Sequence, residues 1–66
     1  MITDYVTTDG TMFRVQGLDD KQAQLFECVD GEWIELAYAP LSFIVNVHLP
    51  AEINSRKLTL VSAKSH

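Results

Sequence analysis

The sequence is poor in cysteine, with Cys28 as its only example among 66 residues. One cysteine cannot form a disulfide within the chain, and disulfide-free chains are typical of reducing compartments. We therefore expect a cytoplasmic protein. Domains below roughly 70–80 residues have little core and are commonly stabilised by disulfides, metal or self-association. A homo-oligomer is accordingly one expected form of this chain.

Long apolar runs are also missing. The most apolar stretch, LAYAPLSFIVNVHL, is interrupted by Pro40, Asn46 and His48, and it is shorter than the roughly 20 residues that a membrane-spanning helix needs. The first residues, MITDYVTTDG, contain no basic segment followed by an apolar one, so they do not have the pattern of a secretory signal. We expect no membrane partner.

Basic side chains are few, with five Lys and Arg against nine Asp and Glu, and the net charge is −4. Proteins that bind nucleic acid usually cluster basic residues, whereas here only Arg56 and Lys57 are adjacent. This balance argues against nucleic acid as a partner. It leaves an alternative, a nucleic-acid-linked regulator that is either a weak binder through this pair or an acidic mimic inhibiting a host DNA-binding protein. The acids available to a mimic are Asp19, Asp20, Glu27, Asp30, Glu32 and Glu35.

The composition is that of one globular domain over residues 1–66, with 47% hydrophobic and 21% charged residues. Two segments of it share a pattern, TTDGTMFRV (7–15) and CVDGEWIEL (28–36). An Asp-Gly dipeptide between alternating segments is a strong signal for a β-hairpin with a two-residue turn. We therefore predict two tandem hairpins, with positive φ at Gly10 and Gly31.

A two-residue turn fixes the register of the first hairpin and places Val6 opposite Phe13 and Tyr5 opposite Arg14. Alternation then separates the side chains into two faces. The predicted inward set is Ile2, Asp4, Val6, Phe13 and Val15, with Asp4 as a misfit. The predicted outward set is Tyr5, Thr7, Met12, Arg14 and Gln16.

The second hairpin places Cys28 opposite Trp33 and Leu25 opposite Leu36. Its predicted inward set is Ala23, Leu25, Val29, Ile34, Leu36 and Tyr38. Its predicted outward set is Gln24, Phe26, Cys28, Trp33, Glu35 and Ala37. The unexpected consequence is that Phe26 and Trp33 lie together on the face that nominally meets water.

The segment PLSFIVNVHL (40–49) has the alternation of a strand and also the spacing of a helix. Its β-branched residues favour a strand, which would leave SFIVNV as an apolar strand edge open to a partner. After it, PAEIN predicts one helical turn that begins at Pro50, and residues 56–63 predict a strand before a frayed end. The expected fold is mainly β: an antiparallel meander of two hairpins plus one or two further strands, in a curled sheet or a small SH3-like barrel.

The residues that could carry chemistry are sparse. Cys28 could be a nucleophile with His48 as its base. These two with His66 and an acidic residue could bind zinc, but no pair has the close spacing of a structural metal site. A lone cysteine in a strand is more often a small buried apolar residue. We therefore expect no enzymatic activity, no cofactor and no bound metal.

An interaction surface is the better-supported function. Tryptophan and tyrosine are enriched at the energetic centres of protein interfaces, and Trp33, Phe26, Met12 and Tyr5 fall on the predicted outward face. The competing interpretation is that segment 40–49 folds over this face and buries the rings. We predict a small non-enzymatic module that binds another protein or itself.

The arrangement YVTTDGTMFRVQG…LFECVDGEWIEL over residues 5–36 resembles small uncharacterised proteins of enterobacterial phages and prophages. These begin with a strand–DG–strand unit and continue with a second one that ends in Gly-x-Trp. The resemblance implies an accessory protein of a phage or mobile element, and it assigns no catalytic or binding residue.

Overall fold

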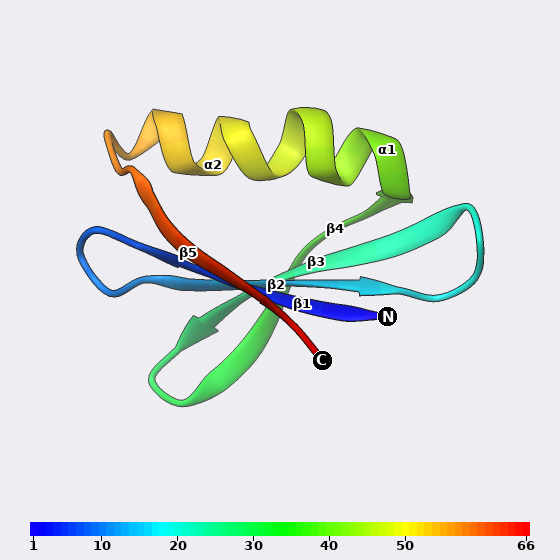
Figure 1. The fold of residues 1–66 in the computed structure, drawn as a ribbon, viewed down its shortest axis with the longest axis horizontal. Helices are drawn as coiled ribbons and strands as arrows, with labels where there is room; N and C mark the ends of the chain where they lie inside the picture. The colour runs from blue at the N-terminus through cyan, green and yellow to red at the C-terminus, as the bar shows by residue number, and fades with distance from the viewer.

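Five antiparallel strands form one sheet, and one helical segment crosses one of its faces (Figure 1). The computed structural model describes residues 1–66. The strands are β1 (Ile2–Thr7), β2 (Met12–Gly17), β3 (Gln22–Val29), β4 (Glu32–Pro40) and β5 (Leu60–Ser65). Their order in the sheet is β4-β3-β2-β1-β5. The predicted fold class, an antiparallel meander plus a further strand, is confirmed, and the sheet is open rather than closed into a barrel.

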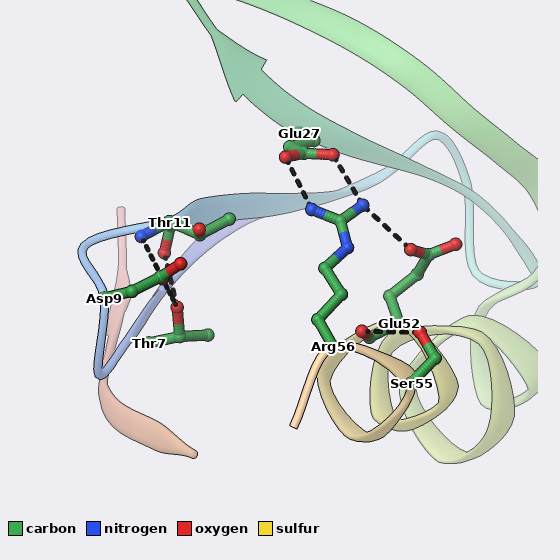
Figure 2. A network of polar contacts seen from close by, with 7 residues as sticks. All are labelled: Thr7, Asp9, Thr11, Glu27, Glu52, Ser55 and Arg56. Carbon is green, nitrogen blue, oxygen red and sulfur yellow. Dashed lines mark hydrogen bonds and ion pairs between the residues drawn. The ribbon is translucent and has the colours of Figure 1, made fainter. Parts of the chain in front are cut away.

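The first turn is longer than predicted. The N–H of Gly10 donates to the carbonyl of Thr7 at 3.0 Å, and the N–H of Thr7 donates to the carbonyl of Thr11 at 3.0 Å. Gly10 has a φ of 87°, as expected, but the loop contains Thr8 and both residues of the Asp-Gly pair. The Asp9 carboxylate holds this shape because it accepts bonds from the Thr7 hydroxyl at 2.9 Å and the Thr11 N–H at 3.0 Å (Figure 2).

This extra loop residue shifts the register of β1 by one position. Val6 is paired with Met12, Tyr5 with Phe13 and Asp4 with Arg14. The predicted faces of β1 are therefore wrong, because a slip of one residue moves every side chain of a strand to the other side. The predicted inward positions of Phe13 and Val15 on β2 are correct, since both are fully buried.

The second turn follows the prediction. Asp30 and Gly31 have φ values of 51° and 81°, as a two-residue turn with two left-handed positions requires. Cys28 is paired with Trp33, as predicted, but the register shifts beyond this point.

A bulge causes that shift. Phe26 is paired with Glu35 and Leu25 with Ala37, so Leu36 is an extra residue on β4. Ala37 therefore turns toward the core and Tyr38 turns outward, the reverse of the prediction. Four apolar side chains of this hairpin are exposed although the prediction places them inside: Val29, Ile34, Leu36 and Tyr38.

Residues 41–55 form one continuous helical segment, so the predicted strand over 40–49 is wrong. Its parts are α1 (Leu41–Phe43), the π-helical segment η1 (Ile44–His48) and α2 (Leu49–Ser55). The Leu49 N–H donates to the Ile44 carbonyl five residues back. Pro50 lacks an N–H and its ring crowds the carbonyl four residues back, which accounts for the wider turn before it.

The helical segment supplies three of the seven core residues. Ile44, Leu49 and Ile53 pack on one face of the sheet. The sheet residues beneath them are Phe13, Val15, Ala23 and Leu25. Of the positions that strand alternation would have buried, Leu49 is in the core, whereas Phe43, Val45 and Val47 are exposed. No helix of this structure has both the length and the apolar character needed to span a membrane.

Strand β5 forms the edge of the sheet next to β1. It begins at Leu60, later than the predicted start at residue 56, because α2 and a turn occupy the residues before it. It pairs with β1 up to Ser65, and the His66 N–H donates to the Ile2 carbonyl at 2.8 Å. The predicted fraying of this end is therefore wrong.

Candidate functional site

One face of the sheet has no other element packed on it, and we call it the open face. The helical segment lies along the opposite face (Figure 1). Strand pairing arranges the side chains of the open face in rows across the strands. The central row runs from β5 to β4 as Lys64, Asp4, Arg14, Phe26 and Glu35.

A row of apolar side chains lies next to this central row. Val6 is paired with Met12, and Cys28 is paired with Trp33, so these four residues occupy one neighbouring row. Phe26 lies diagonally opposite Trp33 across β3 and β4, a spacing that large rings can bridge. All of these side chains except Trp33 come from the three inner strands, and all are partly exposed.

Arg14 connects the aromatic side of the open face to its polar side. Its guanidinium carbon lies 4.3 Å from the centre of the Trp33 ring, within the range of a cation–π contact. Nε of Arg14 donates to Oδ1 of Asp4 at 2.7 Å, and Nη2 donates to Oδ2 at 3.0 Å. A fork of this kind fixes the orientation of the guanidinium, so Arg14 holds Trp33 in a defined place.

Asp4 is the most constrained charged group on the open face. Its side chain is 12% exposed, and Nε2 of His66 lies 2.7 Å from its Oδ2. The hydrogen bonds from Arg14 lower the pKa of Asp4 to about 2, helped by His66 and opposed by burial. Trp33, Arg14, Asp4 and His66 thus form a connected chain that reaches from β4 to β5, and we call it the transverse chain.

Of the four predicted interaction residues, the structure brings three together. Trp33, Phe26 and Met12 share the open face. Tyr5 does not join them, because the register shift places it on the helix side, where it packs against the core. There it lines an apolar groove between the helical segment and the start of β5, with Leu49, Ile53, Leu58 and Leu60 among its neighbours.

The competing interpretation of Trp33 is wrong. Segment 40–49 was the part of the chain that could have covered the ring, but it lies across the opposite face of the sheet. Arg14 stacks on the ring, and Trp33 remains partly exposed on a face that no element covers.

Arg56 forms its ion pairs on the opposite side of the sheet. Its guanidinium donates to both oxygens of Glu27 on β3, at 2.7 and 2.8 Å, and to Glu52 on α2 at 3.0 Å (Figure 2). These bonds raise the pKa of Arg56 and lower that of Glu27, with burial opposing both shifts. The contact joins α2 to the sheet. A nucleic-acid binder would use Arg56 and Lys57, and of these two only Lys57 has no ion pair.

The residues considered for catalysis lie apart. Cys28 is on the open face, whereas His48 is in η1 on the other side of the sheet, with its ring 4.8 Å from that of Phe43. His66 contacts Asp4 and neither of these two. No group of three or more His, Cys, Asp or Glu side chains has a geometry that could hold a metal ion.

Sequence reasoning missed Asp4 and Arg14. A two-residue first turn predicts an inward position for Asp4, where it is a misfit. The signal was present: with a three-residue loop the opposite charges of Asp4 and Arg14 fall directly across from each other, a favourable cross-strand pair.

Comparisons with models of known protein families, with curated proteins and with solved structures found no match to this chain.

Proposed function

We propose that this chain is a small non-enzymatic protein-interaction module that binds its partner through the open face of the sheet. We further propose, from the resemblance of residues 5–36, that it serves as an accessory protein of a phage or mobile element. The observation that carries the binding proposal is the position of Trp33, on a face that no part of the chain covers.

The composition of the open face supports this function. Interface centres are enriched in Trp, Tyr, Met and Arg, and here Trp33, Met12, Phe26 and Arg14 lie on adjacent strands. On the side of the central row away from Met12 lie the paired amide side chains of Gln16 and Gln24, which offer hydrogen-bonding groups. A protein interface usually combines apolar contacts of this kind with polar ones.

The rigidity of the open face also supports it. Binding is weakened by the entropy lost when mobile side chains become ordered. Trp33 and Arg14 are already held by stacking and by two hydrogen bonds to Asp4. A partner would therefore meet a surface whose largest side chain is in place before contact.

The test is affinity capture from an enterobacterial lysate with three forms of the immobilised chain: wild type, Trp33→Ala and Ile34→Ala. Ile34 is the matched control, since it is the next residue of β4, is 45% exposed and faces the other side of the sheet. A partner retained by wild type and Ile34→Ala but lost from Trp33→Ala is expected. Equal capture by all three folded forms would contradict binding through the open face.

A further inference from the structure

We infer that the open face binds a second copy of this chain, in a face-to-face dimer whose two-fold axis runs parallel to β2. This inference rests on the proposed function and names its partner. The two sheets would lie against each other with a helical segment on each outer side. Its basis is the pattern of charge along the central row of the open face.

The two ends of that row carry opposite charges. Lys64 is at the β5 edge and Glu35 is at the β4 edge, and both are exposed. Neither belongs to an ion pair within the chain, since Glu35 accepts only a bond from the Gln24 amide at 3.0 Å. Each is therefore free to pair with a charge on another molecule.

A two-fold interface must be complementary to itself, and this restricts the axis. Rotation about an axis parallel to the central strand places β4 of one copy over β5 of the other. Glu35 then faces Lys64 of the second copy, and the reciprocal pair forms at the other edge. Rotation about the perpendicular axis stacks β4 on β4, which brings like charges together at both edges. The charge pattern selects the first arrangement.

The same rotation brings the apolar side chains together. Each row lies over its own equivalent in the second copy, so the row that contains Met12, Cys28 and Val6 meets an identical row. Met12 lies on the central strand and contacts the second Met12. The twist of the sheet does not disturb this match. A two-fold rotation keeps the handedness of the twist, so the facing surfaces of the two copies follow the same curvature, as in aligned sheet packing.

Arg14 also lies on the central strand, but its charge does not oppose the dimer. Its guanidinium is bonded to its own Asp4 on β1 and is neutralised by it. The rotation places β1 of the two copies on opposite sides of the axis, so the two guanidinium groups do not meet. Each copy keeps its own transverse chain.

The area sets the strength of the association. Five strands at about 4.8 Å spacing give a face roughly 24 Å wide. Three rows of side chains along the strands extend it to about 20 Å, so each copy would bury on the order of 500 Å². The total of about 1,000 Å² is at the lower end of specific interfaces. We therefore expect a reversible dimer whose population depends on concentration.

Charge reversal tests this arrangement by sedimentation equilibrium over a wide concentration range. Glu35→Lys and Lys64→Glu should each weaken dimerisation by at least about tenfold, because each single change creates two like-charge contacts across the axis. The double variant, Glu35→Lys with Lys64→Glu, should recover most of the wild-type affinity. Glu32→Lys is the matched control on the same strand and the other face, and it should leave the affinity unchanged.

Cross-linking provides a second measurement that does not depend on these charges. In a Cys28→Ser background, Met12→Cys should give a covalent dimer with a short bismaleimide, because the two positions meet at the axis. Ala51→Cys, on the exposed side of α2, should not. Circular dichroism confirms that each variant is folded.

The outcomes separate this inference from the proposed function. A monomer at every concentration, or a double variant no stronger than the single ones, overturns the dimer. Neither result bears on Trp33-dependent capture of a different protein, which would still support the open face as a binding surface. Dimerisation that follows the charge pair supports the inference.

Discussion

Gly10 and Gly31 have φ values of 87° and 81°, yet they belong to turns of different length. In the first turn the Asp9 carboxylate supplies the stabilising bonds and Gly10 alone adopts the left-handed conformation. In the second turn Asp30 adopts it too, with a φ of 51°. Asp tolerates this conformation better than most residues, so the same dipeptide supports both turns.

Replacing either of these glycines by valine should lower the free energy of unfolding by more than about 1 kcal/mol, since a β-branched residue is strained at positive φ. Urea denaturation followed by circular dichroism measures the change. Gly17→Ala is the control, because Gly17 does not have a positive φ and its substitution should cost less. Equal stability of Gly31→Val and wild type would contradict the turn.

Trp33 is the residue on which the proposed function depends, and its stability contribution distinguishes a surface ring from a core ring. Trp33→Ala should lower the free energy of unfolding by about 1–2 kcal/mol, through the lost contact with Arg14 and partial burial. Phe13→Ala removes a fully buried ring and should cost about 3–5 kcal/mol. Denaturation below the concentration at which the chain associates gives both values. A loss for Trp33 as large as that for Phe13 would contradict its place on an open face.

Among the elements, the segment 41–55 shows where local pattern and tertiary context compete. Its β-branched residues favour a strand, but a strand there would leave Phe13, Val15 and Leu25 without cover. The helix buries these three side chains under Ile44, Leu49 and Ile53. Burial of this apolar area outweighs a propensity difference of a few tenths of a kcal/mol per residue.

Substitutions in this segment tell the helix from the strand. Ile44→Ala should lower the free energy of unfolding by about 2–5 kcal/mol, since Ile44 is fully buried. Val47→Ala should cost well under about 1 kcal/mol, because Val47 is 46% exposed. An alternating strand would bury Val47 and Val45 instead. The reverse order of the two losses would therefore support the strand.

On the scale of the whole molecule, Asp4 connects strands that are far apart in the sequence. Through Arg14 and His66 it joins β1 to β2 and to the residue after β5. It lies near the two ends of the chain, which the pairing of β1 with β5 places side by side (Figure 1). Loss of its charge should therefore weaken the attachment of β1 to β2 and to the end of β5.

The stability of the protein should fall in acid for this reason. The pKa of Asp4 is lowered from 3.8 to about 2 by folding. A lowered pKa means that the ionised group stabilises the fold above pH 4, and that this contribution is lost as the pH falls toward 2. We expect a loss of about 1–2 kcal/mol, allowing for solvent screening.

Urea denaturation at a series of pH values measures this loss, with Asp4→Asn as the control. The variant should be less stable at neutral pH and should lose less between pH 4 and 2. Glu27, whose pKa is also lowered, contributes to the acid sensitivity that remains. Identical pH profiles for the variant and wild type would exclude Asp4 as the source.

The sequence alone was sufficient for the meander and for much of its core. Paired Asp-Gly turns and period-two alternation are local signals, so they indicated two hairpins and the inward positions of Phe13, Val15, Ala23 and Leu25. They also indicated that Trp33, Phe26 and Met12 share a face. The predicted length of the second turn, two residues, is correct because Asp30 and Gly31 can both adopt the left-handed conformation that such a turn needs.

Local side-chain bonds and tertiary structure together decided what strand alternation leaves open. The first loop has a third residue, which the local bonds of Asp9 to Thr7 and Thr11 stabilise, and that single residue reversed the faces of β1. The bulge at Leu36 and the helix over 41–55 depend on covering apolar side chains contributed by other strands. Alternation along one segment contains no information about such distant contacts. The transverse chain depends on the strand register, which alternation by itself does not determine.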